Sequence, residues 1–312
     1  MSKYKKLNFQ GIKTYSIHER ASKVHTAEFA KVLNDNPSFS DFFSSLPNIL
    51  TGKDFTNFIR IYRLAIESHS MILFMIGAHV IKVGLSPLLI DAMHRGWIQH
   101  LALNGAGVIH DVEIGLYGCT SEDVAEGLQD GTFGMVREST HFINKAVKKG
   151  KGKLGYAESV AKALQQTDGQ HLNLSLLYHA YRLNIPVTAH PAIGTEIIHQ
   201  HPDVDPEALG ETAWRDFQIF SQSLSTLDNN SLVLNIGSAV ILPEVFLKGL
   251  TIVRNLGHPA FGFTTATFDM IRQYRPAVNV VERPTAGGGQ GYYFLGHHEI
   301  MLPLLFAALK SI

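Results

Sequence analysis

The chain has 312 residues, of which 45% are hydrophobic and 17% are charged, so it can bury a substantial core. Its 27 basic and 27 acidic side chains cancel while the 16 histidines are neutral, which excludes a basic nucleic-acid-binding surface over the whole molecule. The single cysteine, Cys119, excludes an intramolecular disulfide and fits a reducing compartment. We therefore expect a globular cytoplasmic protein that binds no nucleic acid.

The first 50 residues have weak periodicity, and we expect them to form an irregular arm or a small helical cap. Residues 51–312 are expected to form a single domain. The basic start of the chain leads into polar sequence, without the apolar stretch of a secretion signal. The longest apolar run, residues 71–78, is far shorter than the roughly 20 residues that span a bilayer, so no membrane partner is expected.

Short apolar or β-branched runs alternate with longer segments of helical periodicity in residues 51–312. This alternation predicts an α/β fold in which mostly parallel strands are joined by crossover helices. The expected strands are Ile72–Ile76, His100–Asn104, Pro186–His190, Leu232–Ile236, Ala260–Thr264 and Val278–Val281. The expected helices are Asp54–His69, Ser86–Arg95, Ser121–Gln129, Met135–Lys148, Tyr156–Gln166, His171–Leu183, Pro206–Leu227, Pro243–Asn255 and His298–Leu309. Ligands of such folds bind at the carboxyl ends of the strands.

The second expected strand runs into Asn104, Gly105, Ala106 and Gly107. Glycines there let the backbone approach a phosphate closely, so a dinucleotide could bind at this turn. The dinucleotide fingerprint Gly-x-Gly-x-x-Gly requires glycine at position 110, where this sequence has His110. The sequence therefore does not indicate a standard dehydrogenase loop, and the alternative interpretation is a plain tight turn.

His110, Asp111 and Glu113 follow after two apolar residues, and imidazole and carboxylate groups suit zinc or manganese. On a helix, however, positions i, i+1 and i+3 do not all share one face. We therefore expect polar contacts to a ligand and no metal here, with hydrogen-bonded packing as the alternative.

A second polar cluster follows the third expected strand, where His190 is succeeded by Glu196. Glu196 could open a helix near a bound ligand while His190 reaches into the same cleft. The pair His199 and His201 is more typical of exposed residues at the surface or at a helix end than of a metal site.

Four of the five residues 287–291 are glycine, and Arg283 precedes them in the same loop. Such a loop can hold an anionic or planar ligand, and a flexible loop without a ligand is the alternative. The loop leads to His298, at the start of an apolar helix.

Three segments together resemble the amino-terminal, NAD-binding half of deoxyhypusine synthase, namely 77–84 (GAHVIKVG), 95–98 (RGWI) and 104–111 (NGAGVIHD). Segments 184–187, 191–192 and 264–269 are similar to later strand ends of that family, so the resemblance covers roughly residues 55–310. It implies a doubly wound, Rossmann-like domain with helices on both faces of the sheet, usually in a homotetramer, with NAD sites near subunit interfaces.

By position, the resemblance implies three NAD-binding loops, to which we add the end of the strand Leu232–Ile236. The expected cofactor-binding residues are Gly77, Ala78, His79, Lys82, Asn104, Gly105, Ala106, Gly107, Gly237, Ser238, Thr264 and Thr265. Glu196 is similar in position to an acidic residue that binds ligand near the diamine in that family.

Deoxyhypusine synthases oxidise spermidine with NAD and carry its butylamine part on a lysine, whereas this chain has no lysine between Lys248 and Lys310. We therefore expect an NAD-binding transferase or oxidoreductase that acts on a small amine or polyamine-type substrate without a lysine imine, rather than deoxyhypusine synthase itself. His110 is the expected general base or acid, because its unperturbed pKa near 6.5 allows either role. Asp111 or Glu113 would orient it.

In the same hypothesis Glu196 pairs with the substrate ammonium, and His190 and His298 are further catalytic candidates. An alternative is a nucleotide-binding or regulatory protein that has lost catalysis. A metal-dependent hydrolase built on the histidines is less favoured, because the sequence has no His-Glu-x-x-His motif. The absence of a Gly-x-Ser-x-Gly motif likewise leaves serine hydrolases without support.

Overall fold

The computed structural model describes residues 2–311 and contains a six-stranded sheet in which every neighbouring pair of strands is parallel. The strands are β1 (Ile72–Ile76), β2 (His100–Asn104), β3 (Val187–His190), β4 (Leu232–Ile236), β5 (Thr264–Asp269) and β6 (Gln290–Leu295). Their order, β3-β2-β1-β4-β5-β6, is that of a doubly wound, Rossmann-like sheet. The predicted fold class is therefore confirmed, and the winding reverses between β1 and β4.

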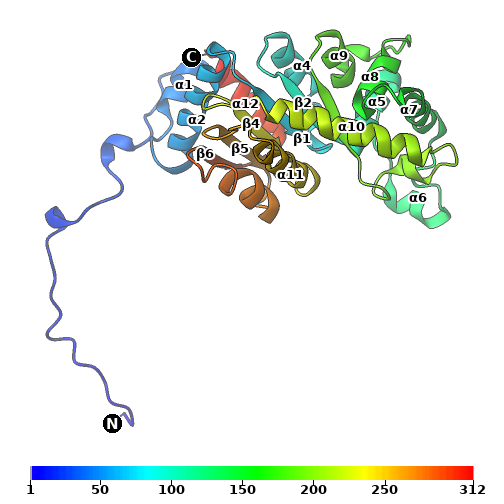
Figure 1. Cartoon of the computed structure of the whole chain (residues 1–312). Coiled ribbons are helices and arrows are strands. Elements are labelled where there is room, and N and C mark those ends of the chain that lie inside the picture. Colours follow the sequence, from blue (N-terminus) through cyan, green and yellow to red (C-terminus); the bar gives the residue numbers. More distant parts are fainter. Residues whose placement is uncertain (1, 312) are drawn as a thin grey trace.

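Helices cover both faces of this sheet (Figure 1). One face packs against α2 (Leu50–Glu67), α4 (Ser86–His94), α5 (Gly105–Tyr117), α9 (Leu176–Arg182) and α12 (His298–Ser311). The other packs against α10 (Pro206–Leu224), α11 (Ile241–Asn255) and a π-helix, η5 (Pro276–Glu282). The remaining helices are α1 (Phe39–Ser45), α3 (His79–Lys82), α6 (Val124–Asp130), α7 (Arg137–Gly150) and α8 (Tyr156–Leu164), with short 3-10 turns at Ile17–Glu19, Thr26–Glu28, Leu172–Leu174 and η4 (Ile197–Gln200). In residues 2–311 no helix has the length and apolar character needed to cross a membrane.

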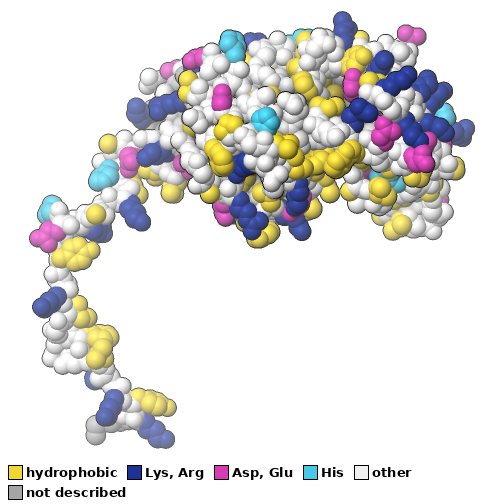
Figure 2. All heavy atoms as spheres, in the orientation of Figure 1, with side chains coloured by type: hydrophobic (Ala, Val, Ile, Leu, Met, Phe, Trp, Pro, Cys, Tyr) yellow, Lys and Arg dark blue, Asp and Glu magenta, His cyan; other side chains and the backbone are white. Residues whose placement is uncertain are grey.

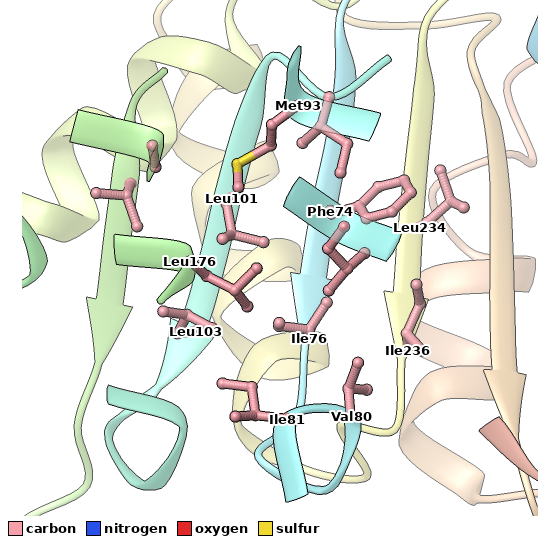
Figure 3. Close-up of a cluster of buried hydrophobic side chains, with 14 of the residues drawn as sticks. Phe74, Ile76, Val80, Ile81, Met93, Leu101, Leu103, Leu176, Leu234 and Ile236 are labelled. Carbon is pink, nitrogen blue, oxygen red and sulfur yellow. The ribbon is translucent and has the colours of Figure 1, made fainter. Parts of the chain in front are cut away.

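The central strands are apolar on both sides because both of their faces are covered. All five residues of β1 are buried. Phe74 and Ile76 belong to the larger core cluster, whereas Leu73 and Met75 belong to the cluster under α10 and α11. Figure 3 shows part of the larger cluster, with side chains of β1, β2 and β4 side by side and Leu176 of α9 next to Leu101 and Leu103 of β2. Each fully buried side chain of this size contributes about 1.5–3 kcal/mol.

The chain before α1 extends away from the rest of the molecule and holds only short 3-10 turns within its described residues (Figure 1). This agrees with the irregular arm predicted for the beginning of the chain. Apolar and basic side chains alternate along it (Figure 2), and Tyr4 and Leu7 are more than four-fifths exposed.

Two predicted strands are wrong in place or kind. Residues 278–281 lie in the π-helix η5, because a short apolar run is equally compatible with a buried helical turn and Pro276 favours a helix start. The strand predicted at Ala260–Thr264 begins at Thr264 and ends at Asp269. Thr264 and Thr265 therefore pair with the first two residues of β4, at the amino end of the sheet, and they do not belong to a loop at the carboxyl ends of the strands. This corrects their expected role in binding the cofactor.

The glycine-rich loop also lies at the amino end of the sheet, because it leads into β6. A Cβ added at Gly289 would overlap the carbonyl oxygen of Phe263, and one at Gly291 would overlap that of Val281. These two glycines allow β6 to pack closely against its neighbours.

Candidate functional site

The segments that follow β1, β2 and β3 line an open cavity of about 670 Å³. Its walls come from Lys82 of α3, from one face of α5, from the start of α7 and from residues 195–197 after β3. A further part comes from residues 119–136, the covering segment, which contains α6. Three loops at the carboxyl ends of neighbouring parallel strands therefore meet at one cavity.

Helix α5 begins directly after β2 because Asn104 caps it, its side-chain oxygen accepting a hydrogen bond of 3.0 Å from the Gly107 N–H. Gly105 is the first helical residue, and a Cβ added to it would overlap the Glu196 carboxyl group. The helix ends at Gly118, which has the left-handed φ of 71°. The cavity-lining residues of α5 are Ala106, Ile109, His110, Glu113 and Tyr117, whose spacing of three or four places them on one helical face.

Asp111 points away from this face and is fully buried. Its carboxylate accepts hydrogen bonds from the Ser175 hydroxyl at 2.6 Å and from the backbone N–H groups of Leu176 and Leu177 at 2.6 and 3.1 Å. Burial raises the pKa of Asp111 to about 6. The side chain thus joins α5 to the start of α9, so that of the two candidates Glu113 is the one that shares a helical face with His110.

His110 and Glu113 are connected through Thr120 of the covering segment. The Thr120 hydroxyl lies 2.5 Å from His110 Nδ1 and donates a hydrogen bond of 2.5 Å to Glu113 Oε2. The Ser139 hydroxyl of α7 donates to Glu113 Oε1 at 3.2 Å. His110 Nδ1 and Glu113 Oε2 are themselves 3.9 Å apart, too far for a direct hydrogen bond.

Burial, with a smaller effect from the Lys82 ammonium, lowers the pKa of His110 to about 4. The imidazole is therefore neutral at pH 7, and the 3.9 Å approach to Glu113 is not an ion pair. This differs from the sequence-based expectation of a pKa near 6.5, because the sequence did not show how far α5 and the covering segment exclude water. A neutral ring can accept a proton or a hydrogen bond, but it does not act as an imidazolium acid at this pH.

Glu196 lies beside Gly105, at the start of α5, and its side chain is 4% exposed. Oε1 accepts hydrogen bonds from the Ala192 N–H at 3.0 Å and from the Thr195 hydroxyl at 3.3 Å. Oε2 is 3.4 Å from His199 Nε2, but the alignment is poor and neither atom has a hydrogen-bond partner within the described chain. Burial raises the pKa of Glu196 to about 7.

The cavity combines apolar walls with an excess of carboxyl groups. Glu113, Glu122, Glu138 and Glu196 line it, and Lys82 is the one Lys or Arg among the lining residues within positions 2–311. Such a lining favours a ligand that has an apolar body and at least one positive charge.

His190 does not line this cavity. It is the last residue of β3 and is buried, its ring packing against Phe220 of α10 and its Nε2 lying 3.2 Å from the Thr188 hydroxyl. The same hydroxyl contacts His100 at 3.0 Å. Burial lowers the pKa of His190 to about 3, so this histidine belongs to a neutral hydrogen-bonded network inside the fold.

The remaining cofactor candidates lie where the winding reverses between β1 and β4. Gly77 follows β1 and lies so close to Gly237 that an added Cβ would overlap the Gly237 carbonyl oxygen. The Ser238 hydroxyl accepts a hydrogen bond of 3.2 Å from the Leu242 N–H in the first turn of α11. Ala78 precedes α3, and the His79 ring lies 5.9 Å from that of His298. His298 is 1% exposed, its Nε2 is 3.3 Å from the Phe268 carbonyl oxygen, and its Nδ1 has no partner among the described residues.

Sequence reasoning missed Thr120, Ser139, Glu122 and Glu138, all of which line the cavity. Thr120 is ten residues from His110, a spacing without meaning on a helix, and it meets His110 only because the chain turns back after Gly118. Among residues 2–311 no group of three His, Cys, Asp or Glu side chains comes together as potential metal ligands. The described chain therefore offers no set of metal ligands for the alternative of a metal-dependent hydrolase.

Neither a protein-family model nor a curated protein matches the sequence. Among solved structures, the chain is similar to AgrE in a ternary complex with ornithine and NAD⁺, with a TM-score of 0.54 and 14% identity over 83% of this chain and 33% of that one. It is also similar to ArgZ, an arginine dihydrolase from the ornithine-ammonia cycle in cyanobacteria, with a TM-score of 0.51 and 17% identity over 83% of this chain and 31% of that one. The chain thus spans about a third of these two proteins.

A putative deoxyhypusine synthase from Entamoeba histolytica has a TM-score of 0.54 and 10% identity, over 89% of this chain and 94% of that one. At these identities the similarity establishes a shared Rossmann-like fold. The resemblance to deoxyhypusine synthase holds at the level of the fold, which AgrE and ArgZ share.

Proposed function

We propose that this chain is an NAD-binding enzyme that oxidises a small amine at a carbon bonded to nitrogen, without a lysine imine. The observation that carries the proposal is the cavity at the carboxyl side of a doubly wound sheet, in which a buried carboxyl group, Glu196, has an oxygen without a partner in the described chain. A ligand N–H fills that position best, because a buried acceptor without a donor is costly.

The turns that follow β1 and β4 are our choice for the dinucleotide site. In folds of this strand order the dinucleotide crosses the crevice at the reversal of the winding, where Gly77 and Gly237 let the turns after β1 and β4 approach each other closely. The buried His298 Nδ1 offers an acceptor that a ligand can satisfy. Lys82, at the end of α3, connects this region with the cavity. When bound, NAD would supply the hydride acceptor.

The oxidation requires that the amine lose a proton and the adjacent carbon a hydride. The substrate ammonium gives one proton to a base, the two electrons of the C–H bond leave with the hydride, and the nitrogen lone pair forms a C=N bond. Glu196 is our choice for the base, because its pKa of about 7 is matched to neutral pH. This refines the sequence-based hypothesis, in which Glu196 only paired with the ammonium.

His110 has a different part in this proposal. With a pKa of about 4 its ring is a weak base, so it holds the amine by accepting a hydrogen bond rather than by taking the proton. Glu113 acts on it through Thr120.

Calorimetric titration of the full chain with NAD tests the cofactor. Saturable heat is expected, and no heat up to millimolar NAD would remove the proposal. The second test follows NADH absorbance with two probes, 1,4-diaminobutane and ornithine. Lys82 can pair with the carboxylate of ornithine only, so Lys82→Met should raise the KM for ornithine more than that for the diamine.

The alternative of a non-catalytic nucleotide-binding protein predicts a different pattern. NAD would raise the melting temperature through mass action, while neither probe nor related amines would yield NADH. A His110→Ala variant adds a further distinction, because the enzyme hypothesis requires a loss of rate with little change in NAD affinity.

A further inference from the structure

The covering segment does not belong to the core of the fold. All seven residues of α6 are at least partly exposed, and Gly118 and Gly134, at the ends of the region, have left-handed φ values of 71° and 76°. Gly134 is held by the Glu122 carboxylate, 3.0 Å from its N–H, and by His201 Nε2, 3.1 Å from its carbonyl oxygen. The segment therefore lies over the cavity as a separate piece of chain, and it brings Thr120 to α5.

The hydrogen bonds of Thr120 fix which nitrogen of His110 carries the proton. A hydroxyl has one hydrogen to donate, and a carboxylate can only accept. Since Thr120 donates to Glu113 Oε2, its oxygen must accept from His110 Nδ1–H. The neutral ring then has a lone pair at Nε2, which makes no hydrogen bond within residues 2–311, and the residue lines the cavity.

We propose that Thr120 is a positioning residue, which holds His110 in the Nδ1–H tautomer and so presents Nε2 to the substrate as an acceptor. Glu113 alone cannot do this, because 3.9 Å separates its nearest oxygen from Nδ1. Ser139 fixes the other Glu113 oxygen and keeps the carboxylate turned toward Thr120. The inference rests on the proposed function for the use made of Nε2, but the tautomer itself does not depend on NAD or on an amine.

Nitrogen NMR of the ¹⁵N-histidine-labelled full chain at neutral pH tests the tautomer directly. Wild-type His110 should show a protonated Nδ1 and an unprotonated Nε2. Thr120→Val keeps the shape and removes the hydroxyl, so a mixture of tautomers is expected, and Thr120→Ser should restore the single tautomer. The matched control is Thr132→Val, on the same segment, whose hydroxyl bonds to Asp130 instead. It should leave the His110 signals unchanged.

A protonated Nε2 in the wild type would overturn the proposal without any variant, which keeps it testable if Thr120→Val fails to fold. An unchanged tautomer in well-folded Thr120→Val would overturn it as well. If an amine substrate is found, Thr120→Val should lower kcat/KM for the amine by about 10-fold, as expected for the loss of one hydrogen bond to the substrate, with NAD affinity unchanged and rescue by Thr120→Ser. Failure of NAD to bind would remove the proposed function and leave the tautomer result standing.

Discussion

The two halves of the sheet use glycine for different purposes. At the carboxyl end of β2, Gly105 makes room for the Glu196 carboxyl group, a side chain of the cavity. In the half formed by β4, β5 and β6, Gly289 and Gly291 make room for backbone carbonyl groups at the amino end of the strands. In both halves, therefore, glycines mark places where another part of the chain packs closely against the backbone. Whether a ligand site is involved depends on whether the glycine lies at the carboxyl or the amino end of the strand.

The largest effect is expected in the cavity half, from Glu196→Gln. The neutral amide keeps the shape but cannot take a proton, so amine turnover should fall by about 100- to 1000-fold. In the wild type the rate should rise with pH through about 7, because Glu196 is protonated below that pKa and ionised above it, and the variant should lack this rise. The matched control is Glu282→Gln, an exposed carboxylate of η5 in the other half, for which steady-state rates should not change.

A smaller effect is expected on the opposite face of α5. Asp111→Ala removes a buried acceptor and leaves the Ser175 hydroxyl and two N–H groups of α9 without it. Denaturant titration should show that the free energy of unfolding falls by about 3 kcal/mol. The NAD affinity of the folded variant should stay the same. A folded variant of full stability with impaired NAD or amine binding would mean that Asp111 belongs to the site after all.

The smallest effect is expected from substitution of a glycine in each half of the sheet, Gly289 and Gly105. Gly289→Ala should destabilise the protein by about 1–3 kcal/mol, because the added methyl group must displace the Phe263 backbone, and it should leave turnover unchanged. Gly105→Ala should cause a similar loss of stability but also displace Glu196, so turnover falls. Equal effects of the two substitutions on turnover would contradict the division of roles between the halves.

The sequence was sufficient for the strands whose apolar runs are buried on both faces, β1, β2 and β4, because such runs have few other interpretations. It failed where local signals were ambiguous. Residues 278–281 are apolar and β-branched but form a helix behind Pro276, and β6 is an edge strand with an exposed, glycine-containing start.

For the site, helical spacing correctly separates His110 and Glu113 from Asp111, because residues three apart share a face and adjacent ones do not. The bridge through Thr120 depends on how the chain returns after Gly118, which no local pattern encodes. The low pKa of His110 and the high pKa of Glu196 depend on burial by segments far apart in the sequence. Residue type and spacing therefore indicate candidates, and tertiary structure determines their protonation.

The most direct test of the account is a crystal structure of the full chain with NAD bound. We expect density for the dinucleotide to cross the crevice between β1 and β4, beside Gly77 and Gly237, and to reach the cavity that contains His110 and Glu196. Dinucleotide density at the glycine-rich loop at the amino end of β6, or at any place that leaves this cavity uninvolved, would contradict it.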